Sequence, residues 1–163
     1  MIQKKICLLG ATGVGKTSLV KQYVEGIFSE KYLTSIGVKI DKKDVSLDSE
    51  TLQLMLWDIE GIDRYCGFQA KYLRGASAYI LVVDQTRSQS LTEGEEIQAL
   101  IKQVVDIPGI LAINKSDLPE TWHWSENEID QIKTNFTLSC YTSAKTGEGV
   151  ENLFSSLAAL LVD

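Results

Sequence analysis

A glycine-rich segment near the N-terminus, residues 10–17, has the residue types and spacing of a loop that holds phosphate groups. Its glycines allow consecutive backbone N–H groups to turn toward one centre. A helix that starts here points its positive dipole end at the same anion. Lys16 supplies a mobile charge for the outer phosphates, and Thr17 supplies a hydroxyl for Mg²⁺. The residues expected to contact phosphate are Gly13, Val14, Gly15, Lys16, Thr17 and Ser18.

A second segment, residues 57–61, carries the pattern DxxG at the end of an apolar run that is typical of a strand. Asp58 at this position can hold Mg²⁺ through water, and the Gly61 N–H can meet a γ-phosphate. Taken alone, DxxG is a weak signal because chance matches are common. Its weight comes from standing in register with the phosphate loop and the segments that follow.

A third segment, residues 114–117, reads NKxD and directly follows another apolar run. Asp117 only accepts hydrogen bonds, so it can take two from the N1 and N2 donors of guanine. Adenine lacks that donor pair and would leave the carboxylate unpaired. In isolation, Asp117 would be interpreted as a loop or helix-cap aspartate. After the last expected strand, Ser143-Ala144-Lys145 can present a backbone N–H to the guanine oxygen.

Apolar segments of two periodicities alternate along the chain and must position these motifs. Strands are expected at 5–9, 38–47, 51–57, 78–83, 110–113 and 136–141, and helices at 17–24, 68–74 and 90–105. Residues 59–67 are expected to form a loop, and the helix at 90–105 carries its period through Leu91, Ile97, Leu100, Ile101 and Val104. Ser125 and Glu128 form a capping-box signature before a further helix. A final helix carries a stripe of Val150, Leu153, Phe154, Leu157, Leu160 and Leu161. This alternation predicts a doubly wound α/β sheet with its site at the carboxyl ends of the strands.

Length and composition predict a single domain over residues 1–163, because no linker or low-complexity segment interrupts the chain. The net charge of −6 argues against nucleic acid as a partner and against a polybasic membrane anchor. Three cysteines, Cys7, Cys66 and Cys140, are interpreted as reduced thiols. No transmembrane run or signal peptide is visible, and the chain stops without a cysteine for lipidation. We therefore expect a cytoplasmic protein with no direct membrane anchor in this chain.

In this order and spacing, the motifs resemble the Ras superfamily of small GTPases, with details of the Rab branch. The Rab-like details are Ser35-Ile36-Gly37-Val38, Trp57-Asp58, Tyr72-Leu73-Arg74-Gly75-Ala76 and Thr142-Ser143-Ala144-Lys145. The resemblance covers nearly the whole chain. It implies a P-loop NTPase fold, in which five helices cover both faces of a mostly parallel six-stranded sheet.

The same resemblance implies ligands and partners. GTP or GDP would bind with Mg²⁺ held by Thr17, Ser35 and Asp58. Phe28 would lie against the guanine ring and the Lys115 stem on its other face, although Phe28 also fits a loop anchor in the core. Two switches, about 28–38 and 59–74, would contact effector and regulatory proteins.

The chain departs from the family pattern in both switches. Ser35 stands where the family usually has threonine; it keeps the hydroxyl but loses the methyl that helps fix the rotamer. The adjacent Thr34 could take its place by a change of register. Ile62 replaces the glutamine that orients the attacking water, and isoleucine has neither donor nor acceptor.

Glu60 and Arg64 are the other unusual residues of the second switch. Glu60 has three open alternatives: it repels the γ-phosphate, it points outward, or it orients water in place of the glutamine. Arg64 is either an arginine that stabilises the transition state or a solvated surface residue, and we favour the solvated alternative.

These observations predict a guanine-nucleotide-binding molecular switch with slow GTP hydrolysis, in which Lys16, Gly61 and Glu60 are the candidate catalytic residues. The alternative is a pseudo-GTPase, an interaction module that binds nucleotide without cycling; Ile62 and Glu60 favour it. The NKxD segment disfavours a third class, an ATP-using kinase of similar fold.

Overall fold

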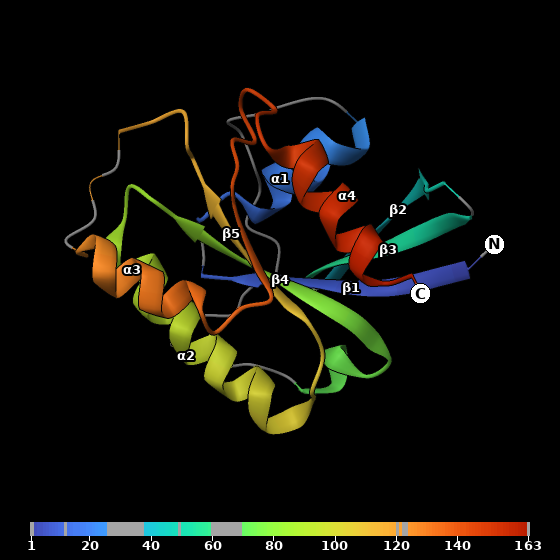
Figure 1. The fold of residues 1–163 in the computed structure, drawn as a ribbon, viewed down its shortest axis with the longest axis horizontal. Coiled ribbons are helices and arrows are strands. Elements are labelled where there is room, and N and C mark those ends of the chain that lie inside the picture. Colours follow the sequence, from blue (N-terminus) through green and yellow to red (C-terminus); the bar gives the residue numbers. More distant parts are fainter. Residues whose placement is uncertain are drawn as a thin grey trace.

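The computed structural model describes residues 2–11, 13–25, 38–48, 50–59, 70–119, 121 and 124–162 (Figure 1). Six strands and four α-helices lie in these ranges, with one 3₁₀ turn. In chain order they are β1 Ile2–Gly10, α1 Lys16–Glu25, β2 Val38–Ser46, β3 Thr51–Ile59, η1 Ala70–Leu73, β4 Ala76–Asp84, α2 Ser88–Val104, β5 Gly109–Asn114, α3 Glu126–Lys133, β6 Leu138–Tyr141 and α4 Val150–Leu160.

All six strands form one sheet in the order β2-β3-β1-β4-β5-β6. Four neighbouring pairs are parallel, and only the β2–β3 hairpin is antiparallel. The first strand of the sequence therefore lies inside the sheet, between β3 and β4. The predicted α/β class and the mostly parallel sheet are confirmed.

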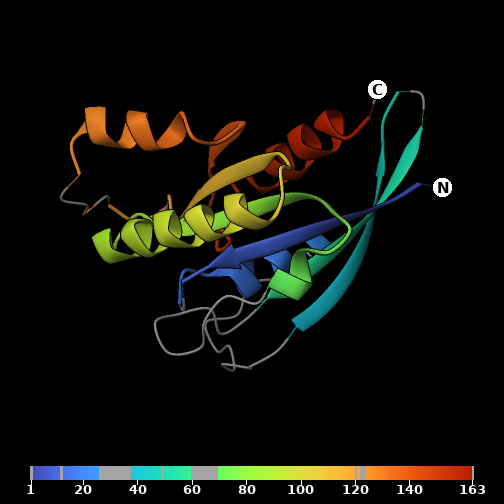
Figure 2. The same ribbon diagram turned by 90° about the horizontal axis from the view of Figure 1, so that it is seen from below.

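Alternate residues of the strands form two separate cores, one on each face of the sheet. On one face, Ile6, Leu8 and Phe154 belong to the core that α1 and α4 cover. On the other face, Leu9 and Ile101 belong to the core that α2 covers. Figure 2 shows the sheet between these layers. The helices on both faces confirm that part of the prediction.

Boundaries and burial differ from the sequence-based expectations in a few places. Ile59 ends β3 rather than opening a loop, and the last strand begins at Leu138 instead of 136. Leu100, Val104 and Leu160 are 42%, 46% and 39% exposed, so they lie outside the cores. The helical period places them beside the buried stripe, but the sheet covers only the narrower stripe through residues such as Ile101 and Leu157.

The expected short helix at 68–74 is a 3₁₀ turn over Ala70–Leu73, and residues 68 and 69 lie outside the described residues. The predicted capping box of α3 is confirmed. The Glu128 N–H donates to Ser125 Oγ and the Ser125 N–H donates to Glu128 Oε2, both at 3.2 Å.

Cys7 and Cys140 are free thiols in strands, and Cys66 lies outside the described residues. Burial raises the pKa of the Cys7 thiol to about 11, and it also raises that of Cys140. Both therefore remain neutral thiols near pH 7, with Cys7 donating to the Tyr72 carbonyl at 3.3 Å.

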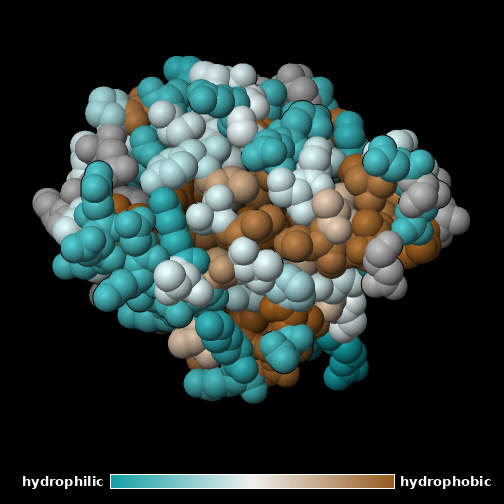
Figure 3. Space-filling model, viewed as in Figure 1, coloured by the Kyte–Doolittle hydropathy of each residue, from teal (hydrophilic) through white to brown (hydrophobic). Residues whose placement is uncertain are grey.

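The surface mixes polar and apolar areas. On the face over which α4 passes, apolar residues form a band between larger polar areas (Figure 3). Within the described ranges, no helix is both long enough and apolar enough to cross a membrane.

Candidate functional site

Five strands bring their carboxyl ends to one edge of the sheet, and each is followed by polar residues. The phosphate loop follows β1, and β3 ends at Asp58 and Ile59. Asp84 ends β4, Asn114 ends β5, and Thr142 follows β6. Because β1, β3, β4, β5 and β6 run in parallel, their ends meet at the edge where α/β sheets bind ligands.

The phosphate loop has a backbone that glycine alone adopts without strain. Gly13 and Gly15 have φ angles of 82° and 91°, in the left-handed region. A Cβ on Gly15 would also lie 2.5 Å from Asn114 Nδ2. Helix α1 begins at the next residue, so the N–H groups of its first turn lie beside the loop. This arrangement suits an anion.

Two charged side chains at the start of α1 and the end of β3 form a buried ion pair. Lys16 Nζ lies 2.6 Å from Asp58 Oδ1, and the two side chains are 4% and 2% exposed. The Thr17 hydroxyl donates to Asp58 Oδ2 at 2.7 Å. Asp58 therefore contacts both Lys16, which was predicted to bind phosphate, and Thr17, which was predicted to bind Mg²⁺.

Asn114 joins three loops through its side-chain amide. Its Nδ2 donates to the Val14 carbonyl at 3.0 Å. Its Oδ1 accepts from the Thr142 hydroxyl at 3.2 Å and from the Ala144 N–H at 3.3 Å. Asn114 is 1% exposed, so these bonds are made away from water. The phosphate loop, the β5 loop and the β6 loop are thus held together by one side chain.

Lys115 connects the β5 loop to two further segments. Its φ of 64° is the only positive value among the described residues other than glycine. Its Nζ lies 2.8 Å from Asp84 Oδ2 and donates to the Gly13 carbonyl at 3.3 Å. The Lys115 stem therefore runs across the site, between β4 and the phosphate loop.

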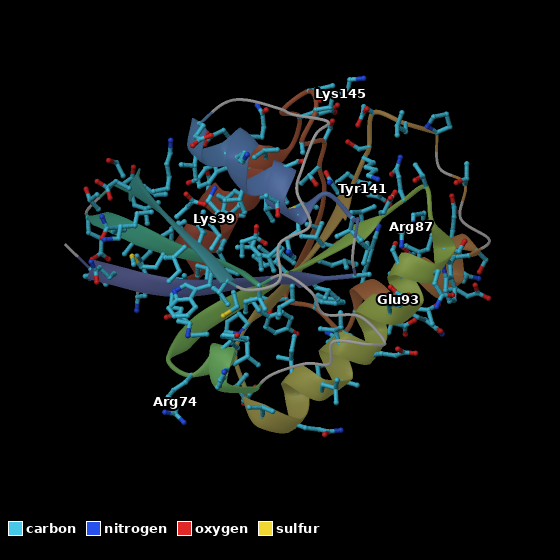
Figure 4. The ribbon with its side chains drawn as sticks, turned by 180° about the vertical axis from the view of Figure 1, so that it is seen from behind. Lys39, Arg74, Arg87, Glu93, Tyr141 and Lys145 are labelled. Atoms are coloured by element: carbon cyan, nitrogen blue, oxygen red, sulfur yellow. The ribbon has the colours of Figure 1, made fainter. Side chains whose placement is uncertain are left out.

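Asp117 is exposed, and its carboxylate is oriented from the β6 loop. Ser143 Oγ donates to Asp117 Oδ1 at 2.8 Å and accepts from the Thr146 N–H at 3.1 Å. Lys145 is exposed, and Figure 4 labels it on this loop. One oxygen of Asp117 is thereby fixed by the scaffold.

Comparison with known proteins decides the family. Residues 5–163 match the Ras family model. The chain belongs to the Ras family. Its curated relatives include RabJ of Dictyostelium discoideum, 32% identical over 99% of this chain, and Rab-1 of Theileria parva, 32% identical over 98%. Rab5 of Nicotiana tabacum is 34% identical over 98% of this chain. The chain spans 64% of RabJ, 74% of Rab-1 and 82% of Rab5.

The family membership confirms the resemblance inferred from the motifs: the chain is a Rab-like small GTPase with a phosphate loop. Ras-family GTPases bind guanine nucleotide with Mg²⁺, and the residues described above suit both. Thr17 and Asp58 offer the hard oxygen donors that Mg²⁺ prefers. The left-handed glycines and the start of α1 offer N–H groups for phosphate. Within the described ranges, no group of three or more His, Cys, Asp and Glu side chains forms a metal cluster.

Several predicted site residues of this small GTPase lie outside the described residues. They are Phe28, Ser35, Glu60 and Gly61, together with Thr34, Ile62 and Arg64. Of the others, Val14, Lys16, Ser18, Asp58, Asn114, Ser143 and Ala144 are buried, whereas Asp117 and Lys145 are exposed. The Ala144 N–H, predicted for guanine together with its neighbours, donates to Asn114 Oδ1.

Two buried residues that organise the site, Asp84 and Thr142, were not among the predicted site residues, although Thr142 stands in the Rab-like segment 142–145. Asp84 is 0% exposed and pairs with Lys115, while its Oδ1 accepts from the Thr86 N–H and hydroxyl at 2.8 and 2.6 Å. Its signal in the sequence was a lone carboxylate at the end of a continuous apolar run. Thr142 had the same kind of signal, a hydroxyl directly after the last strand.

Proposed function

We propose that this chain is a molecular switch that binds GTP and GDP in one domain, residues 1–163, and hydrolyses GTP slowly. The observation that carries the proposal is the exposed Asp117 carboxylate, with one oxygen fixed by Ser143 at 2.8 Å. A carboxylate held in this way can accept the donor pair of guanine. The loop that bears it is bonded to the phosphate loop through Asn114.

In this proposal the residues divide into three groups. The phosphates contact the loop and the start of α1, with Gly61 meeting the γ-phosphate: Gly13, Val14, Gly15, Lys16, Thr17, Ser18 and Gly61. Guanine contacts Phe28, Asn114, Lys115, Asp117, Ser143, Ala144 and Lys145. Mg²⁺ would be held by Thr17, Ser35 and Asp58, and it would neutralise charge on the phosphate oxygens.

Nucleotide binding then requires an exchange of partners at the start of α1. Lys16 would leave Asp58 for the phosphates, and the Thr17 hydroxyl would be a ligand for Mg²⁺. Asp58 is released at the same moment. Because Lys16 and Asp58 are both buried, neither charge is left unpaired if the triphosphate and the cation arrive together.

Effector and regulatory proteins are proposed to bind through the two switches and the strands between them. Support comes from the open side of β2 and β3, where Ile40 is 45% exposed and lies opposite Trp57 in the strand register. Lys5 Nζ lies 3.8 Å from the centre of the Trp57 ring, which fixes the indole. An exposed apolar residue beside a fixed indole suits protein contact.

The first test is base selectivity. Guanine nucleotides should compete for labelled GDP at least about 150-fold better than adenine nucleotides, since two charge-assisted hydrogen bonds amount to about 3 kcal/mol. Asp117→Asn should weaken GDP binding and reduce this preference. Asp130→Asn, an equal change of charge on the exposed side of α3, should leave both unchanged. Equal competition by ATP and GTP would contradict the proposal.

The second test separates a slow switch from a pseudo-GTPase, which the isoleucine at position 62 favours. Single-turnover hydrolysis should be no faster than about 10⁻⁴–10⁻³ s⁻¹, and Ile62→Gln should raise it. If Glu60 repels the γ-phosphate, Glu60→Ala should tighten GTP relative to GDP; if it orients water, the same change should abolish hydrolysis. A protein that binds GTP but shows no hydrolysis, with or without Ile62→Gln, is the pseudo-GTPase.

A further inference from the structure

A groove lies away from the strand ends, where the end of α1, the middle of β2 and the start of α4 meet. Its volume is about 380 Å³, which is in the range of ligand pockets. The residues that matter for its chemistry are Tyr23, Glu25, Lys43, Val150 and Glu151. Helices α1 and α4 lie side by side on this side of the sheet (Figure 1). None of these five residues has a part in the proposed nucleotide site.

The inner wall of the groove is rigid. The Tyr23 ring stacks on the ring of the fully buried Phe154, with 3.9 Å between centroids and 10° between planes. Tyr23 is 5% exposed and Val150 is 2% exposed, so both are packed into the core that joins α1 to α4. Stacked aromatic rings hold such a wall in one arrangement. A ligand would therefore meet a wall that is already formed.

The Tyr23 hydroxyl forms no hydrogen bond with any residue in the described ranges. Tyr23 is 5% exposed, and its hydroxyl oxygen is part of the surface that solvent still reaches. Burial raises the pKa of Tyr23 far above its ordinary value, and the negative charge of Glu151 raises it further. The hydroxyl therefore stays neutral and lies within the electrostatic reach of Glu151, on the wall of the groove. It is available to accept or donate one hydrogen bond.

The charges around the groove favour a cation. Glu25 and Glu151 are both exposed, and neither forms an ion pair within the part of the chain that the structure describes. Lys43 is the one cation among the lining residues, and its Nζ lies 5.4 Å from the centre of the Tyr23 ring. Two carboxylates against one ammonium leave a net charge of −1, and the whole chain carries −6.

We propose that this groove binds the guanidinium group of an arginine side chain presented by a partner protein. A guanidinium carries five N–H donors in a plane, enough for two carboxylates and the Tyr23 oxygen together. Its aliphatic stem would lie against Val150 and the neighbouring Val24. An ammonium group offers only three donors on one atom and would satisfy fewer of these acceptors. The site is separate from the nucleotide site, so it adds a second binding surface to the proposed switch.

The probe for this proposal is Nα-acetyl-arginine methylamide, titrated into the isotope-labelled full chain and followed by NMR. We expect saturable shifts at residues 22–25, 43 and 147–151, with a dissociation constant in the millimolar range, about what one buried side chain provides. The citrulline analogue has the same shape without the charge and should bind at least about tenfold more weakly. Equal binding of the two analogues, or no saturable shift up to about 50 mM arginine analogue, would overturn the proposal.

Substitutions assign the contacts. Glu151→Gln should weaken binding about fivefold, and Tyr23→Phe, which keeps the ring stacked on Phe154, about threefold. Lys43→Met removes the competing cation and should strengthen binding about threefold. Asp130→Asn on α3 makes the same change of net charge as Glu151→Gln and should have no effect. If Glu151→Gln and Asp130→Asn weaken binding equally, the effect is long-range charge and the groove is not the site.

The source of the guanidinium is tested with two further probes. A capped peptide of glycines around one arginine should bind at least as tightly as the arginine amide, because its backbone continues past the open groove. Free L-arginine carries an α-carboxylate and an α-ammonium in place of peptide groups, so it lacks the backbone contacts of the peptide and should bind more weakly. Tighter binding of free L-arginine than of the peptide would contradict a protein partner.

Discussion

The candidate site has a base end, made of Asn114, Asp117 and Ser143, and a phosphate end, made of Lys16 and Asp58. The polar groups of the two ends are satisfied in different ways. At the base end, Asn114 is bonded to backbone and side-chain groups of the scaffold, and Ser143 fixes Asp117. At the phosphate end, Lys16 and Asp58 neutralise each other. In the proposed mode of binding, the scaffold bonds persist when a nucleotide binds, whereas the Lys16–Asp58 pair opens. On that proposal guanine enters a site already formed, and phosphate enters one that rearranges.

The prediction with the largest expected effect concerns the base end of the site. Asn114→Ala should lower the free energy of unfolding of the nucleotide-free protein by about 3 kcal/mol, because it leaves a buried carbonyl, hydroxyl and N–H without partners. Thr142→Val removes one of these bonds and should cost about 1 kcal/mol. Urea denaturation gives both values. Asn135→Ala, at an exposed asparagine, should change stability by less than about 0.5 kcal/mol. A similar loss for both asparagines would mean that Asn114 does not hold the loops together.

At the phosphate end, a double-mutant cycle of Lys16→Met and Asp58→Asn tests whether the ion pair opens. In the nucleotide-free protein the coupling energy should be about 1–3 kcal/mol, since the two charges pair in a buried place. With GDP and Mg²⁺ the coupling in stability should fall toward zero, because each residue then has another partner. Thermal or urea unfolding with and without ligand measures it. A coupling that stays the same in both states would show that the pair does not open.

The smallest expected effect sharpens the assignment of the base end. Ser143→Ala should weaken GDP about fivefold, equivalent to about 1 kcal/mol, because Asp117 loses the hydroxyl that orients it. Pyrophosphate, which lacks a base, should bind the variant and the original chain equally by calorimetry. Ser139→Ala on the exposed side of β6 serves as the matched control. Equal weakening of GDP and pyrophosphate would place the effect of Ser143 on the loops as a whole.

Residues that act through type and spacing could be predicted from the sequence, and residues that act through tertiary contact could not. Asp58 and Asn114 stand at strand ends and Lys16 at the start of α1, all in recognisable patterns. The fold brings Lys16 to Asp58, and Asn114 to the Val14 carbonyl of the phosphate loop. Asp84 has no pattern of its own; it acts only because β4 lies beside β5, which places it next to Lys115. Likewise, the partners of Asp58 follow from the pairing of β1 with β3.

The same distinction explains the helices and the groove. A period of 3.6 placed Leu100 and Val104 near the buried stripe of α2, but the width of the covered face depends on the sheet beneath it. The stack of Tyr23 on Phe154 joins residues that are far apart in the chain, and no local pattern predicts it. Residues 26–37 and 60–69, where the two switches are expected, lie outside the described residues, so those expectations stay predictions.

The place of β1 inside the sheet has a consequence for folding during synthesis. Ile2 pairs with Leu52, and Ile6 pairs with Ala78, so the first strand made must wait for both of its neighbours. Within the described residues, only the β2–β3 pair is a hairpin of strands joined by a short turn. Such long-range pairing slows folding and keeps an apolar strand exposed meanwhile. Until β4 has left the ribosome, the segment from Ile6 to Leu9 is the part of the nascent chain that a chaperone would be expected to shield.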